Sequence, residues 1–480
     1  MTGRNVDFAG GTRLLHNAGA MRVSKLIGPD LKRVLESTPE ALTEEVLDEL
    51  HPEDLAETMG ELADPQVRQL LAMLPIETAA ELLERLPEER AAELVQGMDT
   101  RLSALLVTEM AADDRADLVQ ELPADAREEI LDKIEQHEPE VAEDVRALTA
   151  YDEESAGGLM TTEYLTIEPA LSVARAIEHV RQLARDQDVE SIYYVFVVTY
   201  DKLVGVLSLR DLILSEPDQQ VSDVMTENVV SVEADQDQEQ VAQEMARYDL
   251  SMIPVVDAQG RMLGVVTVDD VIDVLEEEAT EDLHKMAAMV PIEESYFQTG
   301  FFAFVRSRVT WLVVLFVGEL LTAGVMEAYE AQLAAAMDLV IFIPLIISSG
   351  GNSGSQSSSL IIRALALGEM VPGDWSRVFY RELGMGLALG GMLALVGFAR
   401  AFLGTGISGV DPLAMGLTVG CSVVAVVTLG TLVGSLMPLM IQRLGLDPAV
   451  SSTPFVASLV DVLGLIVYFT IARWIFALGF

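Results

Sequence analysis

One acidic residue stands alone in the last apolar stretch of the sequence. Asp461 is the single side chain that is charged at neutral pH in the run TPFVASLVDVLGLIVYF. A carboxylate at the centre of a lone membrane helix costs about 3 kcal/mol on insertion scales, so this side chain is expected to face protein or water. The alternative is an Asp that is hydrogen-bonded between helices. Mostly small or polar residues share its predicted helix face, which favours a narrow cation path; they are Pro454, Ala457, Ser458, Gly464, Leu465 and Tyr468.

A second polar cluster interrupts an earlier apolar stretch. The run IFIPLIISSGGNSGSQSSSLIIRALALGE combines Pro344 and three glycines with Ser, Asn and Gln. Helix breakers with polar side chains at membrane depth predict local unwinding that lines a water-filled cavity and exposes carbonyl oxygens. The alternative is a helix-packing face made of small residues.

Three further carboxylates lie near these runs. Glu382 opens the third apolar stretch beside Arg381, and Asp447 lies in GLDPAVSSTP just before the last one. Either could attract cations to an inner mouth or could cap a helix. Glu319, in the first apolar stretch, is a further candidate, although no polar residues share its face.

Membrane helices must position these residues. Five apolar stretches, at about 309–328, 339–367, 383–403, 413–441 and 454–478, are each near or above the ~20 residues that span a bilayer. Basic residues mark one side of them, which predicts a multi-pass protein of the inner cell membrane with a cytoplasmic N-terminus and an external C-terminus. These residues are Arg306, Arg308, Arg363, Arg377, Arg381 and Arg443.

The rest of the chain is strongly acidic. Residues 1–280 contain 62 Asp and Glu against 21 Lys and Arg, so they carry −41 of the chain's net charge of −46. This charge argues against a nucleic-acid partner and favours cations. The N-terminus lacks the apolar stretch of a secretory signal, so this half is expected to stay in the cytoplasm. The single Cys421 and five scattered His residues leave no candidates for histidine or zinc chemistry in the membrane half, so an enzyme is not expected.

Two kinds of repeat organise the acidic half. Between residues 50 and 131 a Pro or Asp repeatedly opens an amphipathic run, which predicts an all-α stack of short helices over 1–150, with the first 25 or so residues disordered. Then LMTTEYLTIEP is repeated as VMTENVVSVEA, and GVLSLRDLI as GVVTVDDVI. The duplication resembles a tandem pair of CBS domains, at 151–215 and 216–276. A charged linking helix is expected over 277–300, before a membrane domain at 301–480.

The whole chain resembles the MgtE family of magnesium channels or transporters. The resemblance rests on GGNSGSQ, LIIRALALGE, GLDPAVSSTP, VDDVIDVLEEEATEDLHK and the Asp461 segment, in the family's order. It implies a multidomain membrane protein with a helical N-terminal superhelix, a tandem CBS α/β module, a linking plug helix and a five-helix transmembrane pore domain. It also implies a homodimer whose pore lies on the two-fold axis, with the two copies of Asp461 facing each other. Ser355 and Thr453 depart from the Asn residues of the family's pattern.

This resemblance implies two sets of magnesium ligands. Magnesium prefers one or two carboxylates and several retained waters. In the pore, Asp461 would hold the hydrated ion with carbonyl groups around Gly351 and Ala449, and Asp447 and Glu382 would lie at the mouth. In the cytoplasm, magnesium would bridge carboxylates that otherwise repel one another and so close the pore. The expected bridging residues are Asp249, Asp270, Asp273, Glu278, Glu281, Asp282 and Glu239, facing Asp113, Asp114 or Asp117.

The resemblance also implies a nucleotide site. CBS pairs often bind adenosine nucleotides, and the family suggests ATP at Tyr193, Arg210 and Asp211, although strand packing and a helix cap would explain the same residues. The sequence therefore predicts a magnesium uptake channel or transporter gated by cytoplasmic magnesium. The alternatives are a CBS-regulated channel for another ion and a membrane-anchored nucleotide sensor.

Overall fold

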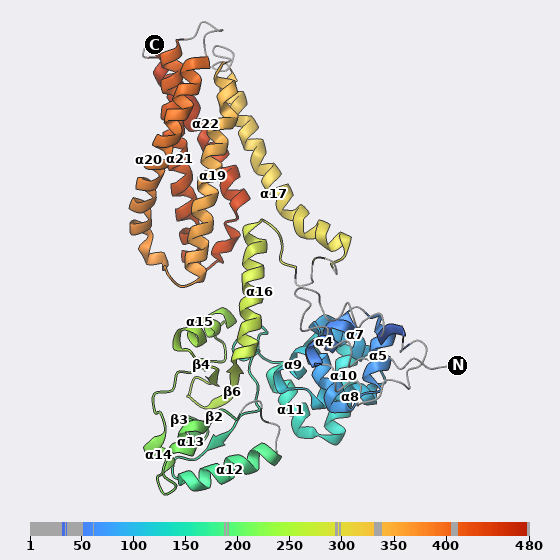
Figure 1. Cartoon of the computed structure of the whole chain (residues 1–480). Helices are drawn as coiled ribbons and strands as arrows, with labels where there is room; N and C mark the ends of the chain where they lie inside the picture. Colours follow the sequence, from blue (N-terminus) through green and yellow to red (C-terminus); the bar gives the residue numbers. More distant parts are fainter. Residues whose placement is uncertain are drawn as a thin grey trace, which may run out of the picture. The chain divides into compact units, whose positions relative to one another are not determined.

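The chain divides into two compact units, Met1–Val274 and Leu275–Phe480. A computed structural model describes residues 31–33, 35, 51–60, 62–186, 189, 192–292, 296, 299–330, 338–404 and 411–477 (Figure 1). The disorder predicted for the first 25 or so residues lies outside these ranges.

The first unit begins with a stack of short helices around one hydrophobic core. In α5 the Pro lies in the first turn, as predicted, whereas Pro75, Pro87 and Pro123 occupy the N-cap position of their helices. Leucine, valine and alanine side chains from each of these helices make up most of the core, with Leu118 contributed by α9 and Val145 by α11. The helices are α4 (Pro52–Gly60), α5 (Asp64–Leu71), α6 (Ile76–Glu84), α7 (Glu88–Gln96), α8 (Thr100–Glu109), α9 (Ala112–Glu121), α10 (Ala124–His137) and α11 (Pro139–Leu148).

The same unit continues as a duplicated α/β module. Each copy has a three-stranded sheet in which a short first strand runs parallel to the second and the third runs antiparallel to it. The duplication read from the sequence is therefore present in the fold. Its first copy contains β1 (Thr166–Ile167), α12 (Val173–Asp186), β2 (Tyr194–Thr199), β3 (Lys202–Ser208) and α13 (Leu209–Leu214). Its second contains α14 (Val221–Val224), β4 (Val232–Glu233), α15 (Gln238–Tyr248), β5 (Met252–Val256), β6 (Met262–Thr267) and α16 (Val268–Met286).

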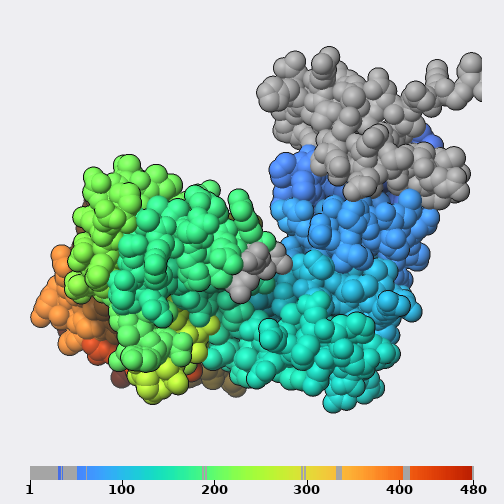
Figure 2. Space-filling view, turned by 90° about the horizontal axis from the view of Figure 1, so that it is seen from below, coloured from blue at the N-terminus to red at the C-terminus, as the bar shows by residue number. Residues whose placement is uncertain are grey.

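The helical stack packs directly on the second copy of the module. Ala112 and Ala116 of α9 and Leu148 of α11 share a buried apolar cluster with residues of α15 and β5, including Val241 and Ile253. In the space-filling view the helical stack, in blue to teal, adjoins the module, in green (Figure 2). Contacts between them therefore connect α9 to the start of α16.

α16 runs across the boundary between the two units. It begins directly after β6, continues through the acidic run of the expected linking helix and ends at Met286. The last helix of the duplicated module and the first part of the predicted linker are thus one helix of 19 residues.

The second unit is a bundle of long helices. Among the described residues, four stretches are long and apolar enough to cross a membrane: 301–328, 372–403, 412–443 and 453–477. α19 is equally long but carries the polar cluster. The helices are α17 (Phe301–Ala328), α19 (Asp338–Ala366), α20 (Trp375–Gly404), α21 (Pro412–Arg443) and α22 (Thr453–Ala477), with short 3₁₀ helices η2 (Pro372–Asp374) and η3 (Pro448–Val450).

The predicted unwinding of the second stretch is wrong, because α19 is a continuous helix that includes Pro344. Its glycines pack closely against another helix. A methyl group on Gly430 or Gly434 of α21 would overlap the carbonyl oxygen of Gly350 or Gly354, respectively. Small residues at this spacing let helix backbones approach closely. The polar run therefore serves helix packing on this side, which was the alternative interpretation of the sequence.

Candidate functional site

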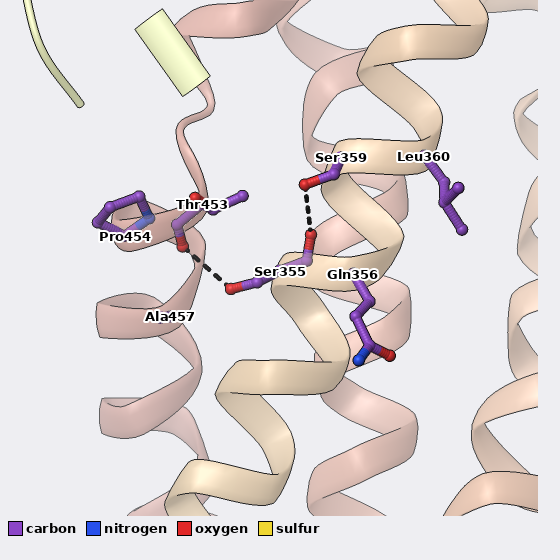
Figure 3. Close-up of a pocket in the computed structure, with 7 residues that line it drawn as sticks. All are labelled: Ser355, Gln356, Ser359, Leu360, Thr453, Pro454 and Ala457. Atoms are coloured by element: carbon purple, nitrogen blue, oxygen red, sulfur yellow. Dashed lines mark hydrogen bonds between the residues drawn. The ribbon is translucent and has the colours of Figure 1, made fainter. Parts of the chain in front are cut away.

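A groove opens between α19 and the start of α22. Its volume is about 690 Å³, and serine, threonine and glutamine side chains form its polar part. Ser355 points towards α22, where its Oγ donates to the carbonyl of Thr453 at 3.3 Å, and Ser359 Oγ donates to the carbonyl of Ser355 at 3.0 Å (Figure 3). The groove is lined by Ser355, Gln356, Ser359, Leu360, Thr453, Pro454 and Ala457.

Asp461 lies one helical turn beyond Ala457, on the same contact between α19 and α22. A Cβ on Gly351 would lie 3.5 Å from Asp461 Oδ1 and 3.6 Å from Ala457 Cβ, so the glycine leaves room beside the carboxylate. Asp461 is half-buried and makes no hydrogen bond or ion pair within the described part of the chain. Glu319 of α17 is exposed in the single chain. The alternative of an Asp that is hydrogen-bonded between helices thus finds no partner among these residues.

Other members of the predicted pore set lie in different surroundings. Gly351 is close to Asp461 as expected, but its carbonyl belongs to a continuous helix, in which such groups accept from the N–H four residues later. Of the residues expected on the face of Asp461, Pro454 and Ala457 line the groove, whereas Gly464 and Tyr468 are buried in the bundle. Ala449 is fully buried.

Glu382 neither lines the groove nor caps a helix. It lies within α20, is only 6% exposed, and accepts a hydrogen bond from Ser357 Oγ of α19 at 2.8 Å. Its backbone carbonyl accepts from Thr431 Oγ1 of α21 at 3.3 Å. No basic side chain of the described residues pairs with it. Glu382 therefore joins three helices of the bundle. Of its two interpretations, the helix cap is wrong, and a place at the ion-attracting mouth stays a prediction.

Removing the Glu382 carboxylate should weaken the bundle. In Glu382→Ala the buried Ser357 hydroxyl loses its acceptor, which costs about 1–3 kcal/mol, and a cavity adds to the loss. Glu382→Gln keeps an acceptor and should stay near the wild type. Thermal unfolding of the purified protein in detergent measures both variants. Equal destabilisation by Gln and Ala would mean that the charge, rather than the hydrogen bond, matters.

Asp447 holds the end of α16 against the entry of α22. Its Oδ1 caps η3 by accepting from the N–H of Ala449 at 2.7 Å, and its Oδ2 lies 2.7 Å from Lys285 Nζ. Lys285 also pairs with Glu281 at 2.5 Å. Burial, followed by repulsion from Asp447, raises the pKa of Asp282 to about 6. Asp447 thus acts as a cap, as one interpretation held, and Lys285 is a partner that the sequence analysis missed.

A half-buried acidic cluster lies where α9 meets α16 within the first unit, with Asp117 and Asp270 half-buried and Glu88 and Glu153 exposed. Burial raises the pKa of Asp117 to about 8, and repulsion from Glu88, Asp114, Glu153 and Asp270 adds to the shift. Burial also raises the pKa of Asp270, although Thr267 Oγ1 donates to its Oδ2 at 2.5 Å. The structure therefore brings together two of the carboxylates expected to face each other, Asp117 and Asp270.

The remaining predicted regulatory carboxylates are more dispersed. Asp249 is exposed and ends α15 in the left-handed conformation, with φ of 53°. Asp273 is exposed on α16, while Glu278 and Glu239 are half-exposed and Asp113 is buried. In the described ranges, no three His, Cys, Asp or Glu side chains lie close enough together to hold a metal ion. Ions at these carboxylates would keep most of their waters.

The predicted nucleotide residues lie beside a cavity of about 830 Å³ in the α/β module. Tyr193 and Arg210 line it, together with apolar side chains of α13. Asp211 does not line it; its N–H donates to Ser208 Oγ at 3.1 Å, and its Oδ2 accepts from the same hydroxyl at 2.6 Å. Two of the three residues therefore lie at the cavity, and the third belongs to a helix cap.

The sequence matches three protein-family models. They are described as a divalent cation transporter, at residues 343–471, an MgtE intracellular N domain, at 50–154, and CBS domains, at 156–217 and 221–277. Together these models cover the helical stack, both copies of the module and most of the bundle.

Named relatives agree with the family models. The magnesium transporter MgtE of Thermus thermophilus is 43% identical over 337 residues, which are 70% of this chain and 73% of the relative. The protein of the same name from Enterococcus faecalis is 36% identical over 69% of this chain and 72% of its own length. A crystal structure of the cytosolic domain of the Mg²⁺ channel MgtE in complex with ATP is 40% identical, covers 52% of this chain and 99% of its own, and has a TM-score of 0.48. The identity and coverage of the two named transporters show that this chain belongs to the MgtE family of divalent cation transporters.

Proposed function

We propose that this chain carries Mg²⁺ across the cell membrane along the α19–α22 groove and past Asp461, and that Mg²⁺ bound to its acidic half closes this path. Relatives 43% and 36% identical are named magnesium transporters. The observation that carries the proposal is the half-buried Asp461, which has no partner in the described chain and lies beside Gly351 next to a polar groove. An intramembrane carboxylate of this kind needs a cation or water nearby.

Polar residues near the groove favour a homodimer in which the ion path lies on the two-fold axis. Ser348, Asn352 and Gln356 form an exposed polar row on α19 in the single chain. Polar side chains at membrane depth are tolerated where protein covers them or where they line water. A second copy related by a two-fold axis would cover this row and bring two Asp461 side chains to one path. Two carboxylates and retained waters suit Mg²⁺.

The arginines favour one orientation in the membrane. Arg363 and Arg443 lie in the last turns of α19 and α21, and Arg377 and Arg381 lie in the first two turns of α20. Because consecutive helices alternate in direction, these ends lie on one side, which the positive-inside rule assigns to the cytoplasm. With α17, α19, α20, α21 and α22 as five spans, the N-terminus would be cytoplasmic and the C-terminus external.

Binding of Mg²⁺ to the acidic cluster would close the ion path through α16. A divalent ion near Asp117 and Asp270 would replace repulsion by attraction and hold α9 against the start of α16. Since α16 also contacts the entry of α22 through Lys285 and Asp447, binding in the first unit could bias the path in the second. The helix would then act as the plug that the family resemblance implies.

Neutralising Asp117 should change how stability depends on pH. An acid whose pKa rises from 3.8 to about 8 on folding keeps its proton in the folded state across that range, so its contribution to stability falls as pH rises through it. Without divalent ions at pH 8, Asp117→Asn should therefore melt about 3 °C or more above the wild type. Mg²⁺ should stabilise the wild type more than the variant. Calorimetry at pH 5 and pH 8 measures both effects.

The matched control is Asp125→Asn. Asp125 is an exposed carboxylate in the first turn of α10. This variant should follow the wild type at both pH values. Parallel curves for the wild type and Asp117→Asn, with the same response to Mg²⁺, would contradict the role of the cluster.

The cavity near Tyr193 and Arg210 is the proposed place for a regulatory adenosine nucleotide. An aromatic ring can stack on the base and a guanidinium can pair with phosphate. A sensor without transport would not require the carboxylate beside the groove, and a channel for an anion would not place Asp461 there. The two MgtE relatives, which match about 70% of this chain, are named transporters rather than enzymes.

Reconstitution tests the proposed function. Purified full-length protein in liposomes should carry Mg²⁺ down its gradient, and Mg²⁺ on the face that bears the acidic half should slow this flux. A magnesium-sensitive dye reports the flux, and protein-free liposomes give the background. Flux no higher than this background would refute transport, and flux that ignores Mg²⁺ on that face would refute gating.

A further inference from the structure

The end of α16 is fixed by one lysine between two carboxylates. Lys285 Nζ lies 2.7 Å from Asp447 Oδ2 and 2.5 Å from Glu281 Oε2. Asp447 and Glu281 come from different parts of the second unit, the loop before α22 and α16 itself. The ammonium thus attaches the helix to the loop.

A second contact is made at the next residue. Thr453 Oγ1, at the start of α22, donates to the carbonyl of Met286 at 3.0 Å. The same Thr453 accepts from Ser355 through its own carbonyl and lines the groove. The end of α16 is therefore joined through one residue to the wall of the proposed ion path.

Lys285 remains charged in this setting. Partial burial works against the charge, but hydrogen bonds to Asp447 and Glu281 prevail and raise the pKa of the ammonium above its ordinary value. Among the described residues, Lys285 is the one basic side chain within ion-pairing distance of Asp447. The carboxylates at this place therefore carry a positive partner before any metal ion arrives.

We propose that Lys285 is a built-in cation that holds α16 against the entry of α22 without metal and competes with Mg²⁺ for the carboxylates of Glu281 and Asp447, so that it sets the magnesium concentration at which the path closes. The inference rests on the proposed function and adds to it the regulation of this contact.

Competition follows from the charges and from the oxygen atoms involved. The Asp447 oxygen that contacts the ammonium is one that a divalent ion would use, and an ammonium beside that ion would repel it. Asp282, half-buried nearby, adds negative charge that favours the divalent ion without being a third ligand. Removing the ammonium should therefore have two effects of opposite direction. The contact weakens without metal, and the carboxylates bind Mg²⁺ more tightly.

Two substitutions separate these effects. Lys285→Met removes the charge and keeps much of the side-chain length, while Lys285→Arg keeps the charge. Lys202→Met is the matched control, because Lys202 is exposed on β3 and makes no ion pair in the described chain. Each full-length variant is reconstituted, and currents of Mg²⁺ are recorded from patches with the acidic half facing the bath.

Lys285→Met should raise the current at zero bath Mg²⁺ and lower the half-closing Mg²⁺ concentration, each by about threefold or more, the effect of a partly exposed ion pair. Lys285→Arg and Lys202→Met should match the wild type. Hydrogen exchange of residues 281–292 should be faster in Lys285→Met without Mg²⁺ and return to the wild-type rate with it, which shows that the variant is folded.

Other outcomes decide between the two proposals. If wild-type current ignores bath Mg²⁺, the proposed gating itself fails. If the wild type closes normally but Lys285→Met leaves the magnesium-free current unchanged, or raises the half-closing concentration, the role of Lys285 is refuted and gating stands. Failure of exchange to return with Mg²⁺ also counts against competition, since the carboxylates would then not rebuild the contact.

Discussion

Asp461→Asn is expected to lower Mg²⁺ flux into liposomes by about tenfold to a hundredfold. The substitution keeps the size of the side chain and removes the negative charge beside Gly351. A hydrogen bond to a charged group contributes about 1.5–3 kcal/mol, which corresponds to that range of binding or rate. Because the hydrated ion would meet this carboxylate from both copies, the larger value is expected. Dye-based flux at matched protein density is the measurement.

Two controls make this result specific. Asp461→Glu keeps the charge and should retain part of the flux. Asp411→Asn removes a carboxylate of the same bundle whose oxygens cap the first turn of α21, at 3.4 Å from the N–H of Leu413 and 3.3 Å from that of Ala414. Because Asn caps helices about as well as Asp, this variant should change stability little and leave flux intact. Full flux in Asp461→Asn would remove this residue from the path.

Gly434→Leu is expected to disrupt the bundle. Even a Cβ at this position would overlap the carbonyl oxygen of Gly354, so a leucine must push α21 and α19 apart. Overpacking of this kind costs about 1–3 kcal/mol or more. The cost should lie at the upper end because the leucine would meet the backbone of Gly354, which cannot rotate away as a side chain can. The melting temperature of the purified protein should fall by about 6–12 °C. Flux should fall with it, because α19 also lines the groove.

Gly391 provides the matched control on α20. A Cβ there would meet nothing within 4 Å, so Gly391→Ala should be neutral or slightly stabilising. Gly434→Ala, with a single added carbon, should lie between the control and Gly434→Leu. A melting temperature of Gly434→Leu equal to that of the wild type would show that the close helix crossing is not needed.

Local patterns predicted the elements well. The residues predicted to open helices, Pro75, Pro87 and Asp99, each lie one residue before the first residue of a helix. They could be read locally because the fixed φ of proline and the capping carboxylate of aspartate act on the neighbouring backbone. The duplication was visible because both copies keep the same apolar strands. Asp461 could be singled out because a lone acid in an apolar run is costly unless protein or water surrounds it.

The error at α19 has a physical cause. Glycine and serine in an apolar stretch serve either an unwound, watery segment or a close helix contact, and composition is the same in both cases. The structure decides because Gly350 and Gly354 meet Gly430 and Gly434, some 80 residues later. Both pairs have the four-residue spacing of a helix contact, so the sequence did contain a signal for this packing.

Long-range charge partners were harder to predict. Asp117 and Asp270 were paired through resemblance to a family, since nothing local connects residues on α9 and α16. Lys285 was overlooked although it follows Glu281 by four residues in a markedly acidic run, the spacing of an ion pair on a helix. Its second partner, Asp447, lies in a loop that no periodicity relates to α16. Glu382 likewise needed three packed helices before its burial could be seen.

Because α16 is one unbroken helix, the number of residues between two of its positions fixes the angle between their side chains. Each residue of an α-helix turns the chain by about 100°, so the seven positions from Val274 to Glu281 determine which way the acidic side chains and Lys285 point. One inserted residue would rotate Lys285 by more than a quarter of a turn away from Asp447, whereas seven would bring it back nearly to its original bearing. Insertions and deletions within this segment should therefore amount to whole helical turns, which keep Lys285 pointing towards Asp447.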